Sequence, residues 1–326
     1  MGAFLENIGG GEQSLPVVLP LVEDLLNSRT WRRHRAALSI LEQCLFAAPA
    51  TFSTYSPVAF QAAIKLASSP AVRVQYQALS LLGGLCEQDG NLSLRRQHGG
   101  EILETMSRLV ESPVSKVSAM ACVALMSFCR GGDDVLDRSQ VVVPYVGHLL
   151  SVLSNGPLSA EIAVGNRLDE GALTTQVRAI GVIACLAEAA RENFVPYYSN
   201  IVPALFACAR LEIDRAEISK LRGAAVETIT IIGLSIGPEN KDVFIPDAEL
   251  LMRVLLPCLS LLPSFTAREA EEKESIPMDQ VLSACARIAT VVEEKYGPFI
   301  EIVLPHLLKR LQADDGVSFK VRLYQT

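Results

Sequence analysis

The sequence predicts an all-α fold in which helix pairs stack into a right-handed superhelical solenoid. The first observation is a signature of two aliphatic residues followed by proline, which recurs at a slowly varying spacing. The second is a step of roughly 40 residues between copies, which is the period of helix-pair repeats. The third is the composition: 50% of the residues are hydrophobic and only 6% are aromatic, which suits aliphatic ridges packed into grooves. The signature ends at Pro20, Pro144, Pro203, Pro257 and Pro305.

Two weaker copies of the signature, around Ala62 and Ile102, fill the long interval between the first two clear ones. Repeats of this length built from two helices are typical of HEAT and armadillo arrays. Each repeat buries its apolar face only against its neighbours, so such an array does not divide into conventional domains. We expect a flexible segment over residues 1–13, an array of about six full helix pairs plus one unpaired helix over 14–312, and a tail over 313–326.

The individual helices follow from apolar segments and the residues that bound them. Thr30 suits a helix N-cap, Pro70 suits a first helical turn, and Gly131-Gly132 and Gly237-Pro238 are stop signals. We expect the first helices of the pairs at residues 15–27, 57–68, 100–112, 141–154, 196–211, 247–262 and 298–312. We expect the second helices at residues 30–48, 70–88, 114–130, 173–193, 216–236 and 276–294.

The recurrent prolines are expected to have a structural role and no chemical one. Proline inside a helix removes a backbone hydrogen bond and bends the helix. We expect the prolines to recur at one position of the first helices and so to give those helices a shared bend. The last helix, at 298–312, has no partner in this sequence, and an unpartnered helix leaves its apolar face bare. We therefore expect the chain to be a piece of a longer array.

Two segments between helices are longer than the others, residues 155–172 and 264–276. Within the second, four glutamates stand against one arginine and one lysine. Insertions in repeat proteins fall on loops and often on a binding face. This charged run is therefore either a solvated segment or an acidic patch for a basic partner.

Charge and cysteine usage limit the classes of partner and site. The formal charge is −7 and the pI is about 5.3. No basic stripe is visible in the sequence, so we expect basic protein partners and no direct binding of nucleic acid. The eight cysteines and four histidines are dispersed and no Cys-x-x-Cys pair occurs, so we expect no metal site. Buried free thiols in a reducing compartment are the expected state of the cysteines.

Membrane and enzyme signatures are missing from the sequence. No signal sequence is visible, and proline, arginine or glutamate interrupts the apolar runs before membrane-spanning length. We expect a soluble intracellular chain without membrane contact. The motifs of phosphate-binding loops, nucleophile elbows and zinc proteases are absent. Nothing places a base beside a nucleophile, so we expect neither catalysis nor a cofactor.

Several motifs carry a resemblance to a known family. The junction at residues 193–203, with Phe194-Val195-Pro196-Tyr197-Tyr198, is one, and the repeat at 221–237, which opens Leu221-Arg222-Gly223, is another. Ser283–Arg287 and the opening Trp31–Ala36 add to them. In order and spacing these motifs resemble the importin-β (karyopherin-β) family, closest to its importin-5 (importin-β3) branch. The similarity runs from about residue 15 to about residue 311, and the chain resembles the central portion of such a receptor.

The resemblance implies a nuclear transport receptor that shuttles between cytoplasm and nucleus. Receptors of this branch bind basic, lysine-rich cargo on a concave face lined by second helices. They bind phenylalanine-glycine nucleoporins between first helices, and Ran-GTP releases the cargo. The main Ran-binding repeats of the family are not represented in this portion. Two alternatives remain open: a non-transport HEAT scaffold for a multi-protein complex, and a truncated product without an independent role.

The resemblance also nominates residues for cargo binding: Gln88, Ser127, Glu188 and Glu227. A lysine signal needs carboxylates or amides for the ammonium ion and apolar grooves for its stem. Gln88 stands where the family has an aspartate and Ser127 where it has an asparagine, and each change removes a charge or an acceptor. Glu227 has an alternative role, as an internal partner of Arg222 or Arg178.

Four arginines recur near the starts or middles of second helices: Arg73, Arg178, Arg222 and Arg287. In HEAT arrays such arginines form ladders with acidic residues of the neighbouring repeat, and we expect that structural role here. Trp31, the only tryptophan, is expected to pack at a junction between repeats.

Overall fold

The computed structural model describes residues 11–88, 92–130, 140–164, 167–211, 216–260 and 276–313. The chain forms two compact units, unit 1 (Met1–Cys185) and unit 2 (Leu186–Thr326). The described residues of both units are almost entirely helical, with a single two-stranded hairpin in unit 1. Gly131-Gly132, nearly all of the charged run at 264–276, and most of the two expected terminal segments lie outside the described residues.

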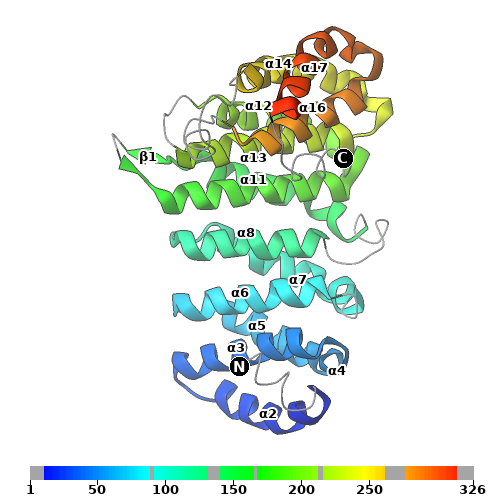
Figure 1. Cartoon of the computed structure of the whole chain (residues 1–326). Helices are drawn as coiled ribbons and strands as arrows, with labels where there is room; N and C mark the ends of the chain where they lie inside the picture. Colours follow the sequence, from blue (N-terminus) through cyan, green and yellow to red (C-terminus); the bar gives the residue numbers. More distant parts are fainter. Residues whose placement is uncertain are drawn as a thin grey trace. The chain divides into compact units, whose positions relative to one another are not determined.

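Unit 1 is built from helix pairs (Figure 1). Its first helices are α2 (Gly11–Leu26), α5 (Ser56–Ala67), α7 (Leu92–Val110) and α10 (Val146–Asn155). Its second helices are α3 (Trp31–Ala47), α6 (Val72–Glu87), α8 (Ser115–Arg130) and the larger part of α11 (Glu170–Ala190). The short elements of the described part of unit 1 are one helical turn, three 3-10 helices and two strands, namely α4 (Pro49–Phe52), η1 (Ser53–Tyr55), η3 (Val143–Tyr145), η4 (Pro157–Ser159), β1 (Ala163–Val164) and β2 (Arg167–Leu168).

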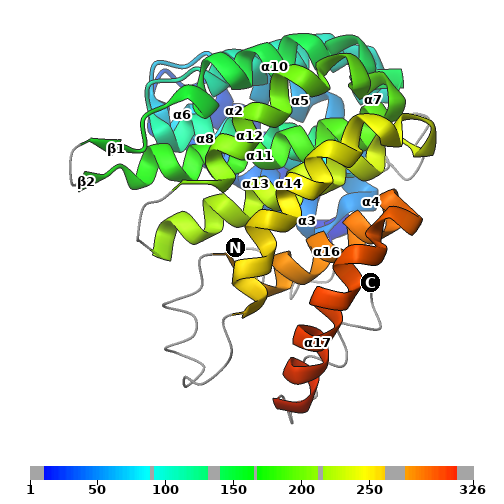
Figure 2. The same ribbon diagram turned by 90° about the horizontal axis from the view of Figure 1, so that it is seen from above.

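The second helices of unit 1 lie side by side and run in the same direction (Figure 1). The first helices α5, α7 and α10 form another layer beside them (Figure 2). Close packing between the second helices α6 and α8 depends on Gly83 of α6, because an added Cβ would lie 3.3 Å from the Cα of Ala124 on α8. The helices bury aliphatic side chains against one another on two sides, which is why the sequence is so rich in them.

Unit 2 continues the same pattern of paired helices. Its elements are η5 (Arg191–Tyr197), α12 (Tyr198–Ala209), α13 (Ala216–Ser235), η6 (Pro238–Asn240), α14 (Lys241–Ser260), α16 (Met278–Val292), η7 (Glu293–Tyr296) and α17 (Gly297–Ala313). The first helices α12 and α14 are joined by the Tyr198 hydroxyl, which donates to Oδ2 of Asp247 at 2.8 Å. The second helices α13 and α16 pack directly together.

The predicted fold class, an all-α helical solenoid, is confirmed, but several helix starts were wrong. Thr30 is the N-cap of α3 as predicted, although its side chain makes no capping bond. Pro70 lies before α6, which begins at Val72. Helix α7 begins at Leu92 rather than near residue 100. Arg95 in this polar segment is buried, and its Nη2 donates to the carbonyl of Phe128 at 2.6 Å, which anchors the start of α7 to α8.

The expectation that the recurrent prolines share one position of the first helices was also wrong. Pro144 lies in η3, ahead of α10, where a helix start tolerates a missing N–H. Pro203 is the sixth residue of α12, whereas Pro257 is the seventeenth of α14. The sequence signature therefore marks the repeats without marking one structural position.

The segment at 155–172, expected as a long loop, is mostly structured. After η4, the strands β1 and β2 pair in antiparallel fashion, with Ala163 opposite Leu168. Gln176 of α11 fixes the segment to the helix, because its Nε2 donates to the carbonyl of Leu158 at 2.9 Å. Helix α11 consequently begins at Glu170, earlier than expected. A binding role for this segment stays a prediction.

All eight cysteines are free and buried, as predicted. The expectation about apolar runs was wrong in two places, since Gln140–Ser159 and Glu170–Ala209 are long and apolar enough to cross a membrane by length and composition alone. Core helices of a repeat array pass the same test because they are apolar on two sides.

Candidate functional site

The second helices of unit 1 form a layer, the second-helix layer, and two carboxylates on it accept hydrogen bonds from side chains of the neighbouring second helix. Glu42 of α3 accepts hydrogen bonds from Nε2 of Gln77 and Oγ of Ser80, both on α6 and both at 2.5 Å. Glu87, the last residue of α6, accepts one from Oγ of Ser127 on α8 at 2.6 Å. Every one of these donors is neutral. The carboxylates are therefore fixed in position while keeping their negative charge.

Neither carboxylate takes part in any of the ion pairs found in the described part of the chain. The position of Glu87 is also unfavourable for its own helix, because the C-terminal end of a helix already carries partial negative charge. The close approach of α6 and α8 at Gly83 brings the buried Ser127 within reach of Glu87. The packing of the repeat thus places a charged group where helix stability alone does not favour one.

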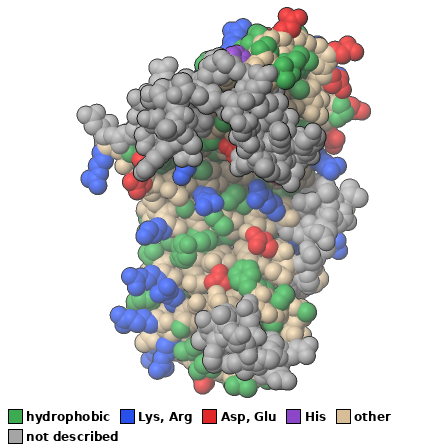
Figure 3. Space-filling model, viewed as in Figure 1, with side chains coloured by type: hydrophobic (Ala, Val, Ile, Leu, Met, Phe, Trp, Pro, Cys, Tyr) green, Lys and Arg blue, Asp and Glu red, His purple; other side chains and the backbone are tan. Residues whose placement is uncertain are grey.

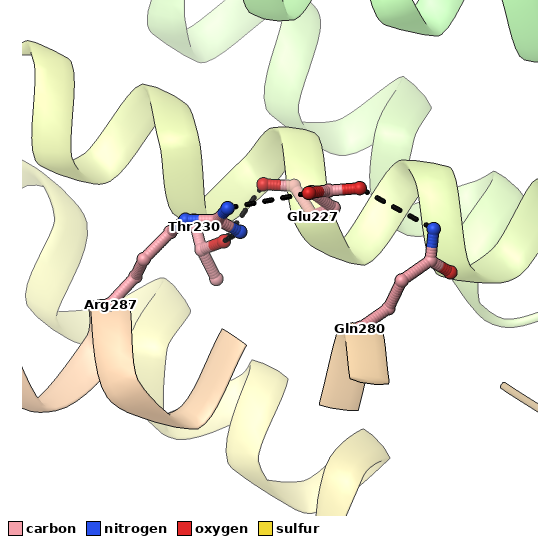
Figure 4. A network of polar contacts seen from close by, with 4 residues as sticks. All are labelled: Glu227, Thr230, Gln280 and Arg287. Carbon is pink, nitrogen blue, oxygen red and sulfur yellow. Dashed lines mark hydrogen bonds and ion pairs between the residues drawn. The ribbon is translucent and has the colours of Figure 1, made fainter. Parts of the chain in front are cut away.

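The corresponding carboxylate in unit 2 has a different environment (Figure 4). Oε1 of Glu227 on α13 lies 3.3 Å from Nη2 of Arg287 on α16, and its Oε2 accepts a hydrogen bond from Nε2 of Gln280 at 3.4 Å. Arg287 also donates to Oγ1 of Thr230 at 3.5 Å. Because a guanidinium neutralises Glu227, this carboxylate is an internal partner and a poorer receptor for an external cation.

Two of the four residues nominated for cargo binding lie together at Glu87. Gln88 follows it directly as the C-cap of α6 and is half-buried, and Ser127 donates to it. Glu188 is exposed on the last turns of α11, in unit 2. Glu227 pairs with Arg287 and not with either of the two arginines that were considered for it. Cargo binding by these four residues stays a prediction.

The four arginines of the expected ladder have four different surroundings. Arg287 bridges α13 and α16 through Glu227. Arg73 lies over the ring of Trp31 at 5.8 Å, at the junction of α3 and α6. Arg222 donates from Nε to the carbonyl of Ala209 at 3.0 Å, at the end of α12. Arg178 is exposed on α11. A shared ladder role for the four stays a prediction.

Sequence reasoning missed Glu42 and Glu87 themselves. A signal for them exists, because their donors follow 35, 38 and 40 residues later, close to one repeat along the chain. A glutamate followed by a neutral donor at the repeat period indicates a bond between neighbouring second helices. Among the described residues, no three His, Cys, Asp or Glu side chains gather as metal ligands.

Comparison with known proteins identifies relatives of this chain. No protein-family model matches the chain. It is 25% identical over 310 residues to importin subunit beta-3 of Saccharomyces cerevisiae, a match that covers 95% of this chain and 26% of that protein. It is 24% identical over 308 residues to the probable importin subunit beta-4 of Schizosaccharomyces pombe, covering 86% and 26%. The chain thus spans about a quarter of the length of these relatives.

Solved structures with a similar fold were also found. A crystal structure of Kap121p bound to Pho4p matches with a TM-score of 0.72 and 24% identity, over 92% of this chain and 26% of Kap121p. Kap121p bound to Nup53p matches with a TM-score of 0.71 and 24% identity, over 92% and 25%. The fold is that of the Kap121p helical solenoid. The homologues of this chain are importin-β (karyopherin-β) family members, which confirms the resemblance.

Proposed function

We propose that this chain is a segment of an importin-5-like nuclear transport receptor that binds basic, lysine-rich parts of cargo proteins on its second-helix layer. Its homologues are importin subunits, and Kap121p has been crystallised with Pho4p and with Ste12p. The observation that carries the proposal is the pair Glu42 and Glu87, each fixed by neutral donors with its charge intact. The activity is binding, without catalysis or a cofactor.

Fixed carboxylates suit the recognition of an ammonium ion. A charge-assisted hydrogen bond from lysine is stronger than one between neutral groups. Because Gln77, Ser80 and Ser127 already hold the carboxylates, little side-chain freedom is lost when a lysine binds. The fourth residue after Glu42 is Phe46, which lies on the same side of α3 and is 57% exposed. Its ring offers apolar surface for the methylene stem and a face for the cation.

The helix layer also sets a spacing for the bound segment. Packed helices lie about 8–10 Å apart, and an extended chain advances about 3.3 Å per residue. An extended segment that crosses α3, α6 and α8 therefore passes one helix about every three residues. Lysines separated by two or three residues match this layer best.

The remaining partners follow from the receptor role. Phenylalanine-glycine nucleoporins would bind the first helices, where Val17, Leu21 and Val58 present exposed apolar side chains. Kap121p has been crystallised with Nup53p. Ran-GTP would release cargo from the whole receptor, and its main binding repeats lie outside the portion that this chain represents. The receptor would work in both cytoplasm and nucleus.

The proposal is tested with a fluorescently labelled peptide that carries lysines at the predicted spacing, titrated with the chain while its anisotropy is followed. The Glu42→Gln/Glu87→Gln variant keeps both side-chain shapes and removes both charges, so its affinity is expected to fall about tenfold or more. The matched control is Glu23→Gln/Glu104→Gln, which removes two exposed carboxylates from first helices. Equal affinities of wild type and the Glu42/Glu87 variant would overturn the proposal.

A further inference from the structure

We propose that unit 1 carries a second interaction surface, a basic edge that binds an acidic segment of a protein partner. The basic edge consists of six exposed cations at or just before the starts of three consecutive second helices. They are Arg29, Arg32, Arg33 and Arg35 at α3, Arg73 at α6 and Lys116 at α8.

Packing brings these helix starts together. At α3 and α6, the guanidinium carbons of Arg32 and Arg73 lie 5.0 Å and 5.8 Å from the ring centroid of Trp31. At α6 and α8, Glu87 contacts Ser127, 40 residues further on, so the start of α6 lies opposite the start of α8. Figure 3 shows Lys and Arg side chains gathered along one edge of this unit.

The charges of the basic edge are not neutralised within the unit. The ion pairs among described residues include none of these six cations. Glu23 and Asp24 lie shortly before Arg29 in the sequence, and Glu111 lies shortly before Lys116; these three acidic residues are exposed and equally absent from the ion pairs of the described residues. A chain of net charge −7 thus presents a positive edge.

Helix stability does not explain the basic edge. The N-terminal end of a helix carries partial positive charge, so cations there are disfavoured and acidic residues are favoured. None of α3, α6 and α8 has an acidic residue in its first turn. Three neighbouring helices break the same local rule without a compensating ion pair. Such positions are expected where function, rather than stability, selects the residues.

The chemistry of the edge favours an acidic protein segment over a nucleic acid. Five of the six cations are arginines, whose planar guanidinium pairs with carboxylates through two parallel hydrogen bonds. Proteins that bind single strands stack bases on free aromatic faces. Trp31, the aromatic residue at the start of α3, has the guanidiniums of Arg32 and Arg73 over its ring instead. An extended segment with runs of glutamate or aspartate fits a row of cations that spans three helices.

This inference is independent of the proposed function. The carboxylates Glu42 and Glu87 lie in the middle and at the end of their helices, whereas the basic edge lies at the starts. The sequence showed no basic stripe because three successive repeats contribute to the edge, through residues 29–35, 73 and 116. Loss of one surface is expected to leave the other working.

The test uses the whole chain and two labelled probes of equal net charge, an acidic peptide of alternating glutamate and glycine and a single-stranded oligonucleotide. We expect wild type to bind the peptide at low salt, and more weakly as salt rises. The edge variant Arg33→Gln/Arg73→Gln/Lys116→Gln is expected to bind it about tenfold more weakly. The matched control Arg167→Gln/Lys220→Gln/Arg253→Gln removes three exposed cations elsewhere and is expected to stay within about twofold of wild type.

Three outcomes would overturn the inference: no binding of the peptide by wild type at low salt, an equal loss in the edge and control variants, or tighter binding of the oligonucleotide than of the peptide. Retained binding of the lysine-rich peptide by the edge variant shows that the variant is folded. It also separates a failure of this inference from a failure of the proposed function.

Discussion

Nη2 of Arg287 lies 3.3 Å from Oε1 of Glu227, so α16 neutralises a carboxylate of α13. In unit 1, by contrast, Glu87 is held by the neutral hydroxyl of Ser127. In both arrangements a side chain of the neighbouring second helix contacts the carboxylate. The contacting group is a cation at Glu227 and a neutral hydroxyl at Glu87. One carboxylate stabilises its own unit, and the other remains available to an external cation.

Removal of the guanidinium is expected to convert the first arrangement into the second. The Arg287→Gln variant should bind the lysine-rich peptide more tightly than wild type, because the carboxylate of Glu227 then has no guanidinium of α16 to offset its charge. The side chains of Arg287 and Glu227 are 27% and 35% exposed, so solvent screens the pair and the loss in unfolding free energy should be at most roughly 1 kcal/mol. Anisotropy titration and urea denaturation measure the two effects. Arg253→Gln removes an equal charge from the same unit, and equal affinities of the two variants would contradict the prediction.

The Arg33→Glu variant is expected to stabilise α3. It creates a capping box with Thr30, in which the N-cap hydroxyl and the glutamate satisfy each other's backbone N–H groups. It also replaces a cation at a helix N-terminus by an anion. Together these changes should add about 0.5–1 kcal/mol to the free energy of unfolding. Urea denaturation followed by circular dichroism measures it, with Arg33→Gln as the uncharged comparison. A lower midpoint for Arg33→Glu would show that Arg33 stabilises the fold.

The Gly233→Ala variant is expected to destabilise unit 2. An added Cβ would lie 2.6 Å from ring carbons of the buried Phe244. That ring is enclosed, so overpacking should cost roughly 1–3 kcal/mol. The control is Gly297→Ala at the start of α17, where an added Cβ meets nothing within 4 Å and the change should be neutral or slightly stabilising. Thermal denaturation of both variants checks the prediction, and it fails if Gly233→Ala melts as late as Gly297→Ala.

Stability is expected to fall in alkali through two buried thiols. Burial raises the pKa of Cys86 and of Cys122 from 9.0 to about 12. The unfolded chain therefore loses these protons first, so their contribution is complete below pH 9 and is lost as the pH rises through 12. Between about pH 8 and about pH 10.5, each thiol should remove roughly 2 kcal/mol from the free energy of unfolding.

Urea denaturation at several pH values measures this slope. The Cys86→Ala variant leaves a small cavity and should be less stable than wild type at neutral pH. Its stability should nevertheless fall less steeply between neutral and alkaline pH, because one titrating group has been removed. Parallel curves for the variant and wild type would mean that Cys86 titrates normally in the folded chain.

The fold was predictable because the repeat period and the aliphatic composition are visible in the sequence itself and do not depend on knowing the contacts. Helix starts were less predictable. The polar segment at the start of α7 is anchored by Arg95, whose guanidinium donates to the carbonyl of Phe128, 33 residues later, and the sequence alone does not reveal this contact. The candidate site was predictable in part. The resemblance led to Gln88 and Ser127, but the charged residue between them in the structure, Glu87, depends on the register of α6 against α8.

The basic edge was out of reach of the sequence for a related reason. Arg73 and Lys116 are isolated cations in the sequence and join the arginines of α3 only when three repeats are stacked. Similarly, Arg287 is the partner of Glu227 because α13 packs against α16, which brings together two residues that are 60 positions apart in the chain. Contacts between repeats are set by helix register, which the repeat period alone does not specify.

The most direct test of the central claim, that lysine-rich segments bind the second-helix layer through Glu42 and Glu87, is photo-cross-linking. A lysine-rich peptide with a photoreactive residue beside a lysine is cross-linked to the whole chain, and mass spectrometry locates the attachment sites. We predict attachment within α3, α6 and α8, and its loss in the Glu42→Gln/Glu87→Gln variant. Attachment confined to the first helices α5 and α7, or unchanged in that variant, would contradict the claim.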